Sequence, residues 1–395
     1  MRSSDARLAA LLALGACVLY VLVGLGHPTD FDYYGRLADA LLHGRWWLTE
    51  APAHLNELQP CGEERWCVVY GAMPALITMP FLAVFDSAAA QTIASQLAGG
   101  LAAAPGYLAL RAIGTPARTA TLVTAFAIAG TTLLFSAADG RAWYMAHAVA
   151  VLFSSIALLV ALRGGPTWVV GALLAVGALA RFPVALAAPG LAIVVSRVRR
   201  EPLLRCLALL AAGALPFALI EIAYDLARWG VPTEAGYAQL TASDPFFDRG
   251  LMSLWYLPRH LYAIFIQAPD FVDGTAFFVR PNWIGESVVL TSPALLLAIA
   301  ALPLARMRSE IGPLALAAAL PLLPDVLHGT VGFAQFGYRF SLDAQPFLLP
   351  LVAIGAAWSA GQWRRPGLGF GALVAWSVVA NLYGAIAIIQ FGYVR

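Results

Sequence analysis

Two carboxylates that could act as a base stand two residues apart near the start of this 395-residue chain. Asp30 and Asp32 lie in the stretch "PTDFDYYGRL", directly after the first long apolar segment, residues 8–26. Beside a cluster of aromatic residues, a carboxylate at the end of such a segment can be partly shielded from water and still reach a substrate. These conditions suit a general base.

The same stretch is also typical of a helix start. Thr29 or Asp30 could cap a helix, and Asp32 could be a first-turn charge favoured by the helix dipole. This helix would lie along a membrane surface. Apolar and small residues follow with helical spacing, namely Leu37, Ala38, Leu41 and Leu42.

A second group of candidate side chains comprises Arg181, Arg259, Arg280 and Arg339. Arg181 could reach the membrane interface from its place between two short apolar segments. Arg259 could contact lipid headgroups, and Arg339 could pair with Asp343, four residues further on.

Acidic residues also occur inside an apolar segment, where they are costly and often functional. Glu221 and Asp225 lie four residues apart within 203–227 and therefore share one helical face. Arg228 offers either of them a simple ion-pair partner.

The cysteines divide into two kinds. Cys17 and Cys206 fall in apolar segments and are expected to pack there. Cys61 and Cys67, in "PCGEERWC", lie in a polar stretch, and a disulfide between them is plausible if that stretch is extracytoplasmic. Their spacing permits a disulfide without requiring one, whereas a zinc site would need two further ligands.

The composition sets the class of protein. The chain is 61% hydrophobic and only 12% charged, with a mean hydropathy of +0.76. A soluble protein of this length could not hide so much apolar surface, and a disordered chain would contain far less. The sequence therefore predicts an all-α polytopic membrane protein, with no nucleic acid among its partners.

Eleven apolar segments are long enough to be considered as spans. After 8–26 they cover residues 88–110, 119–136, 143–162, 166–180, 183–196, 203–227, 286–305, 311–327, 342–361 and 368–389. The segment 70–86 is also apolar, but Pro74 and Pro80 interrupt it. Placing it on the outer face puts most arginines of the short loops in the cytoplasm, as the positive-inside rule requires.

This arrangement predicts a single domain, 1–395, with its N-terminus inside, its C-terminus outside and its polar residues gathered outside. The outer segments are the first loop, 27–87, the tight loop 136–147, the large loop 228–285 and the segment 328–343. A site on this chain is therefore expected on the extracytoplasmic face of the membrane.

The opening stretch also carries a family resemblance. The pattern "PTDFDYYGRLADALLHGRWW" resembles the first outer loop of the GT-C glycosyltransferases, which include protein O-mannosyltransferases and the aminoarabinose transferase of lipid A. Family positions for the catalytic Asp, a Tyr, a Gly and an aromatic residue correspond to Asp30, Tyr34, Gly44 and Trp46. Later stretches that resemble family segments are "VVYGAMPALITMPFLAVF", "GALLAVGALARFPVAL", "YDLARWGVPTEAGY" and "FGYRFSLDAQPFLLPL".

The resemblance implies an integral membrane glycosyltransferase of the bacterial inner membrane. It would move a hexose or pentose, with inversion, from a polyprenyl-phosphate carrier to an extracytoplasmic glycan, lipid or protein. Asp30 would be the general base, with Asp32 as the second candidate, and the four arginines would be candidates for the donor phosphate. The resemblance also implies the eleven-span plan of the protein O-mannosyltransferases.

The chain departs from the family pattern in two places. It contains no lysine, whereas the aminoarabinose transferases use one in the interfacial segment to contact the carrier phosphate. Candidates for an acceptor or second-loop role are Asp139, His147 and Tyr34, and a divalent metal remains possible. A transporter or flippase of lipid-linked glycans is the alternative, although such proteins place paired charges deep within their spans.

Overall fold

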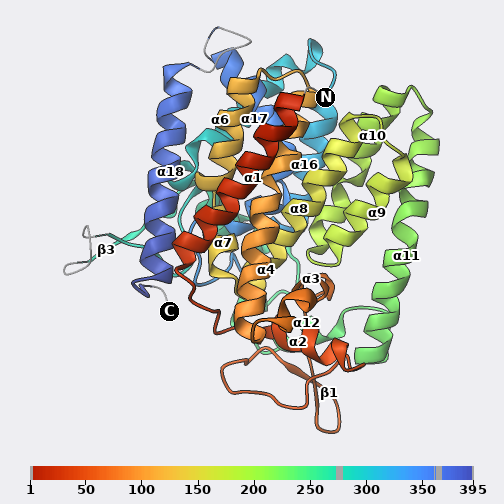
Figure 1. Cartoon of the computed structure of the whole chain (residues 1–395). Coiled ribbons are helices and arrows are strands. Elements are labelled where there is room, and N and C mark those ends of the chain that lie inside the picture. Colours follow the sequence, from red (N-terminus) through yellow and green to blue (C-terminus); the bar gives the residue numbers. More distant parts are fainter. Residues whose placement is uncertain (1–2, 273–278, 360, 362–366, 394–395) are drawn as a thin grey trace.

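The structure is a computed structural model that describes residues 3–272, 279–359, 361 and 367–393. It is a bundle of helices whose smaller elements gather at one end (Figure 1). Helix α1 begins at the upper end of Figure 1, and α18 finishes near the lower end, where the smaller elements lie.

Within the described residues, six helical segments are long and apolar enough to cross a membrane. They are α1 (Ser3–Gly24), α4 with α5 (Ser87–Leu101 and Ala103–Ala112), α8 (Ala142–Leu162), η2 with α10 (Phe182–Ala187 and Ala188–Arg199), α11 (Leu203–Trp229) and α18 (Leu368–Ile389). Helices α6 (Ala117–Ala129) and α7 (Leu133–Asp139) form a seventh if their 51° bend lies within one span.

Shorter apolar helices occupy the remaining predicted segments. They are α9 (Thr167–Ala178), the run η6, α15 and η7 (Pro293–Leu296, Leu297–Ala301 and Leu302–Arg306), α16 (Ile311–Leu327) and α17 (Gln345–Ser359). All eleven predicted segments are thus largely helical, and at least six of them are long and apolar enough to be candidate membrane spans.

Arginines gather where the chain turns at the upper end of Figure 1. The turns join α5 to α6, α8 to α9, α10 to α11 and η7 to α16, and they carry or adjoin Arg111, Arg118, Arg163, Arg197, Arg199, Arg200, Arg205, Arg306 and Arg308. Arg2, Arg364 and Arg365, which the sequence places on the same side, lie outside the described residues.

The lower end holds the short elements. They are α2 (Tyr33–Leu42), the antiparallel hairpin β1–β2 (Gln59–Gly62 and Arg65–Cys67), α3 (Met73–Thr78), η1 (Met79–Ala83), α12 (Ala235–Thr241), η3 (Pro245–Phe247), η4 (Leu254–Tyr256), α13 (Leu257–Phe265), the hairpin β3–β4 (Asp270–Phe271 and Val279–Arg280) and η8 (Arg339–Asp343). The short helix α14 (Val288–Thr291) lies beside the middle of α18. Cys61 and Cys67 form a disulfide at the β1–β2 hairpin, with their Cα atoms 5.8 Å apart.

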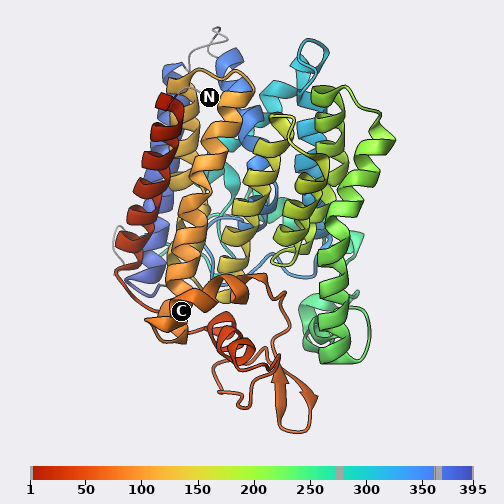
Figure 2. The same ribbon diagram turned by 45° about the vertical axis from the view of Figure 1, so that its right-hand side comes forward.

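The segment 70–86 does not form one continuous helix. It contains α3 and η1, which pack against α2 and α4 at the lower end. Pro74 is the second residue of α3 and Pro80 the second residue of η1, so each proline lies in a first turn, where its missing N–H costs no helical hydrogen bond. The figures place α3 beside α2 (Figures 1 and 2).

The cap of α2 differs from the sequence prediction. Asp32, and not Thr29 or Asp30, is the N-cap residue, and its side chain makes no capping hydrogen bond. The backbone N–H groups of Tyr34 and Gly35 instead donate to Oε1 of Gln91 on α4, at 2.9 and 3.0 Å. The side chain of a residue on another helix therefore accepts the free N–H groups in the first turn of α2. Local spacing in the sequence could not reveal this partner.

Two close backbone contacts position the segments around the site. A Cβ on Gly171 of α9 would lie 2.0 Å from the Leu210 carbonyl oxygen of α11, so only glycine allows the two helices to approach this closely. A Cβ on Gly71 would lie 2.0 Å from the Leu179 carbonyl oxygen. The segment before α3 therefore contacts the end of α9 directly, two residues before Arg181.

Candidate active site

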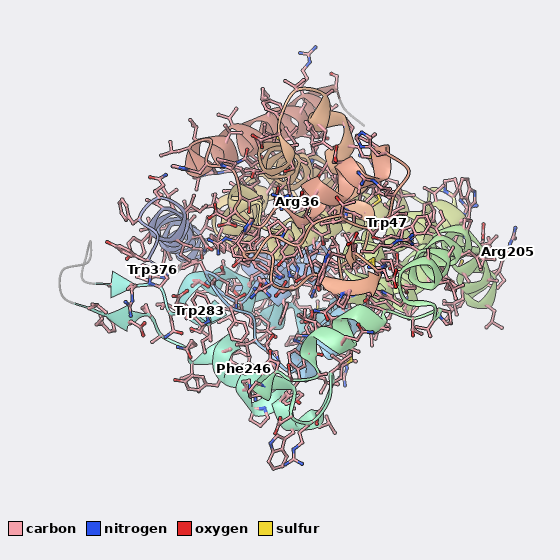
Figure 3. All side chains as sticks on the ribbon, turned by 90° about the horizontal axis from the view of Figure 1, so that it is seen from below. Arg36, Trp47, Arg205, Phe246, Trp283 and Trp376 are labelled. Atoms are coloured by element: carbon pink, nitrogen blue, oxygen red, sulfur yellow. A yellow bond between two sulfur atoms is a disulfide. The ribbon has the colours of Figure 1, made fainter. Side chains whose placement is uncertain are left out.

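A cavity of about 1260 Å³ opens at the lower end of the bundle. Its lining comes from the loop before α2, the segment before α3, the α7–α8 turn, the α9–η2 turn, α12 and the stretch between α16 and η8. Figure 3 views the molecule from this end and labels two lining residues, Arg36 and Trp283. The volume exceeds that of a typical small-molecule pocket, so more than one substrate group can fit.

Both candidate carboxylates line this cavity, but their surroundings differ. Asp32 is 4% exposed; Oδ1 accepts from Arg36 Nε at 2.8 Å, and Oδ2 accepts from the Ser87 hydroxyl. Asp30 is exposed and makes no side-chain hydrogen bond or ion pair with any described residue. Asp32 thus ties α2 to the start of α4, whereas Asp30 is available to a ligand.

Gln91, buried in α4, holds the loop that carries Asp30. Besides capping α2, its Nε2 donates to the Phe31 carbonyl at 2.9 Å and to the Gly140 carbonyl at 2.8 Å. The Thr29 backbone N–H donates to Thr92 Oγ1, also on α4, at 3.0 Å. Asp30 therefore stands between two anchored neighbours.

Three of the four arginines that line the cavity are paired with carboxylates. Arg36 pairs with Asp32, and Arg141 pairs with Asp139 at 3.2 Å. Arg181 donates to Asp343 Oδ2 at 2.7 Å and to Asp325 Oδ1 at 2.9 Å. The positive charge of Arg181 is therefore already met by two acids.

Arg339 is the exception within the described part of the chain. It makes no ion pair; Nη1 donates to the Phe333 carbonyl at 3.3 Å and to Gln335 Oε1 at 3.2 Å. Its Nε is buried without a partner, and burial lowers the pKa of the guanidinium. A desolvated cation without a counter-charge in a cavity is suited to binding an anion.

Four other predicted site residues do not line the cavity: Arg259, Arg280, His147 and Asp139. Arg259 donates to backbone carbonyls and covers the Tyr256 ring, and Arg280 pairs with Asp270 at 3.4 Å. His147 is fully buried, with Nδ1 2.9 Å from Asp343 Oδ1. Asp139 pairs with Arg141, which lines the cavity.

Tyr34 lines the cavity, although its side chain is almost wholly covered. Its hydroxyl has no hydrogen-bond partner among the described residues. Glu221 and Asp225 both approach Arg228, at 3.9 and 2.6 Å, and Glu234 of the cavity lining approaches it at 2.8 Å. Arg228 is therefore the ion-pair partner of both acids of α11, which is the simpler of the two roles that the sequence offered for them.

Glu57 is one of the lining carboxylates that were not singled out from the sequence. Glu57 Oε2 accepts hydrogen bonds from Trp143 Nε1, at 2.8 Å, and from the Tyr70 hydroxyl. Burial raises the pKa of this carboxyl to about 7. Glu57 lies in a polar loop, and its partners come from residues 13 and 86 positions away. Neither periodicity nor spacing could have found it, and the same is true of Gln91.

The described residues contain no group of three or more His, Cys, Asp or Glu side chains arranged to hold a metal ion. Three of the lining arginines, Arg36, Arg141 and Arg181, are paired with carboxylates. What the arrangement provides is one unpartnered carboxylate, Asp30, and one unpaired guanidinium, Arg339, in the same cavity.

These features define a multi-pass membrane protein with a polar cavity at one end of its helices. No family model and no curated protein matches the chain. Among solved structures, ArnT from Cupriavidus metallidurans in the apo state is similar, with a TM-score of 0.53 and 15% identity over 98% of this chain and 77% of that chain. ArnT bound to undecaprenyl phosphate gives a TM-score of 0.50 and 13% identity over 96% and 76%. The chain therefore has a fold similar to that of ArnT.

Proposed function

We propose that this chain is an inverting glycosyltransferase that uses a sugar on a polyprenyl phosphate. The observation that carries the proposal is the cavity itself, which contains a carboxylate free to take a proton and a guanidinium free to bind a phosphate. The ArnT structure of similar fold was solved with undecaprenyl phosphate bound, which supports a lipid phosphate as the ligand class.

Asp30 is the general base in this proposal. It accepts the proton of the acceptor hydroxyl while the acceptor oxygen forms its bond to the anomeric carbon. The bond from that carbon to the phosphate oxygen breaks, and the electron pair leaves with the phosphate. One carboxylate is enough for a single displacement of this kind, which inverts the anomeric centre. Both Asp32 oxygens are already engaged, so Asp32 positions the loop.

Arg339 binds the departing phosphate. Its charge is unmatched and desolvated, so it stabilises the negative charge that develops on the leaving group. Arg181 lines the same cavity but already has two acidic partners. Apolar lining residues provide room for the start of the lipid chain: Phe182, Pro183, Leu240, Leu251 and Met252.

The same proposal places the chain in a bacterial inner membrane. It has eleven spans, with the arginine-rich turns in the cytoplasm and the cavity on the extracytoplasmic side. The acceptor is a glycan, lipid or protein on that side, and the sugar is a hexose or pentose. A cysteine introduced in the loop 228–285 should react with a membrane-impermeant thiol reagent added outside, while one at 198–201 should not.

The test of the mechanism is the substitution Asp30→Asn. Transfer from the lipid donor should fall by about 10²–10⁴, the usual cost of losing a general base, while binding of undecaprenyl phosphate stays intact. The matched change is Asp32→Asn, which should lower thermal stability more than Asp30→Asn does. Near wild-type transfer by Asp30→Asn would contradict the proposed mechanism.

A further inference from the structure

Glu57 lies where three separate segments meet at the cavity. It belongs to the loop between α2 and β1, Tyr70 precedes α3, and Trp143 is in the first turn of α8. All three residues line the cavity. The mechanism above gives none of them a role.

Hydrogen bonds from side chains hold one of the two oxygens of the Glu57 carboxylate. Oε2 accepts from Trp143 Nε1 and from the Tyr70 hydroxyl, and the Glu57 backbone N–H donates to the Tyr33 hydroxyl at 3.1 Å. Oε1 has no hydrogen bond within the described part of the chain. An ionised carboxylate only accepts hydrogen bonds, so Oε1 can receive one from a ligand in the cavity.

The same contacts fix the ring of Trp143. Its indole N–H donates to Glu57 Oε2 and to the Tyr70 hydroxyl, and its ring centroid lies 4.9 Å from that of Phe31, at an angle of 50°. Phe31 is the residue after Asp30. An aromatic surface of fixed orientation therefore stands beside the proposed base and next to a carboxylate with a free oxygen.

Charge connects this pair to the proposed phosphate site. Glu57 has no ion pair among the described residues, but the charge of Arg339 opposes the rise that burial causes in its pKa. The two side chains therefore interact electrostatically in one cavity. In a sugar phosphate the ring is attached directly to the phosphate, so a ring bound at Glu57 is compatible with a phosphate at Arg339.

We propose that Glu57 and Trp143 bind the sugar ring of the lipid-linked donor. Oε1 of Glu57 accepts hydrogen bonds from ring hydroxyls, and the indole of Trp143 contacts an apolar face of the ring. Tyr70 positions the carboxylate. This inference rests on the proposed function and deepens it, because it assigns recognition of the sugar to residues other than the base and the phosphate ligand.

Binding of the sugar by Glu57 and Trp143 would provide selectivity between sugars as well as affinity. A site built to bond a hydroxyl rejects analogues that lack it, because its own polar group is then left unpaired. Glu57 would thus distinguish sugars by the placement of their hydroxyls, whereas Arg339 would bind the phosphate of every donor alike.

The experiment measures equilibrium binding of five lipids to the full chain in nanodiscs. These are undecaprenyl phosphate and the same lipid carrying glucose, mannose, galactose or arabinose. In the wild type, at least one glycosylated lipid should bind about 10-fold tighter than undecaprenyl phosphate, as expected for a hydrogen bond to a charged group. Glu57→Ala should abolish this advantage and leave binding of undecaprenyl phosphate unchanged, which also shows that the variant is folded.

Two further variants separate the roles. Glu57→Gln keeps an acceptor for Trp143 and Tyr70 but loses the charge, so it should retain only part of the advantage. Asp244→Asn is the matched control, because Asp244 also lines the cavity but serves to cap η3. It should keep the full advantage.

The outcomes distinguish the two proposals. If undecaprenyl phosphate itself fails to bind the wild type, the proposed function fails, and the inference fails with it. If it binds, but no glycosylated lipid binds more tightly, only the inference is overturned. The inference is also overturned if the advantage survives Glu57→Ala or is lost in Asp244→Asn.

Discussion

Replacing Gln91 by leucine should disturb the loop that carries Asp30 more than any single change at the cavity surface. Gln91 makes four hydrogen bonds to backbone groups of Phe31, Tyr34, Gly35 and Gly140. A buried hydrogen bond contributes a net of about 1 kcal/mol. Gln91→Leu should therefore destabilise the fold by about 4 kcal/mol, and by more if the four backbone groups find no water.

The matched control is Gln96→Leu, on the same helix and equally buried. Gln96 makes one hydrogen bond, to the Ala138 carbonyl at 3.3 Å, so its loss should cost about 1 kcal/mol. Thermal unfolding in detergent ranks the two variants, and binding of undecaprenyl phosphate reports on the cavity. If Gln91→Leu unfolds no earlier than Gln96→Leu, the four bonds do not hold the loop, and the placement of Asp30 needs another explanation.

Three further changes test other parts of the structure. Arg339→Met should weaken binding of undecaprenyl phosphate at least 10-fold, because the phosphate loses its counter-charge. The control Arg259→Met, outside the cavity lining, should change this binding little. Equal losses in the two variants would contradict the assignment of Arg339 as the phosphate ligand. Burial raises the pKa of Glu57 to about 7, so the carboxyl is mostly protonated at pH 6 and mostly ionised at pH 8. The affinity gained from the sugar should accordingly be greater at pH 8 than at pH 6, and flat with pH in Glu57→Gln. Glu286→Ala should lower the free energy of unfolding by about 2–4 kcal/mol, since the Asn282 and Gly337 N–H groups that donate to Glu286 lose their acceptor. Glu286→Gln should lower it less. A thermal unfolding measurement that gives the opposite order would contradict the importance of these bonds.

Positions of the apolar segments could be predicted from the sequence because a membrane span is a local property. Each predicted segment contains a helix within a few residues of its expected bounds. The number of times that the chain crosses the membrane does not follow from the positions of these segments. Helices such as α9 have only 12 residues, and length alone does not establish whether they span the membrane.

The candidate site was partly predictable, for a physical reason. Asp30 and Arg339 follow or precede apolar segments, so their place at one end of the bundle follows from topology. Arg259 was predicted by the same reasoning, yet its guanidinium is turned towards backbone carbonyls outside the cavity lining. Which way a side chain points is decided by packing.

Contacts between distant residues account for what the sequence could not show. Gln91 bonds residues 49 to 60 positions away, and Glu57 bonds Trp143 across 86 positions. The prediction that Thr29 or Asp30 caps α2 was wrong for the same reason, because the acceptor comes from another helix. Such partners become neighbours only when the chain has folded.

The close glycine contact between α9 and α11 links the position of α11 to the shape of the cavity. A Cβ on Gly213 would lie 1.8 Å from the Trp168 carbonyl oxygen, so an alanine there would force the two backbones apart by more than an ångström. Most of α11 faces away from the other helices, as the green helix at the right of Figure 2 shows. Near its far end, Arg228 holds both the Val68 carbonyl and Glu234 of the cavity lining. A displacement that starts at the Gly213 contact would therefore pass along α11, which contains Pro216, to the residues that Arg228 holds at the wall of the cavity.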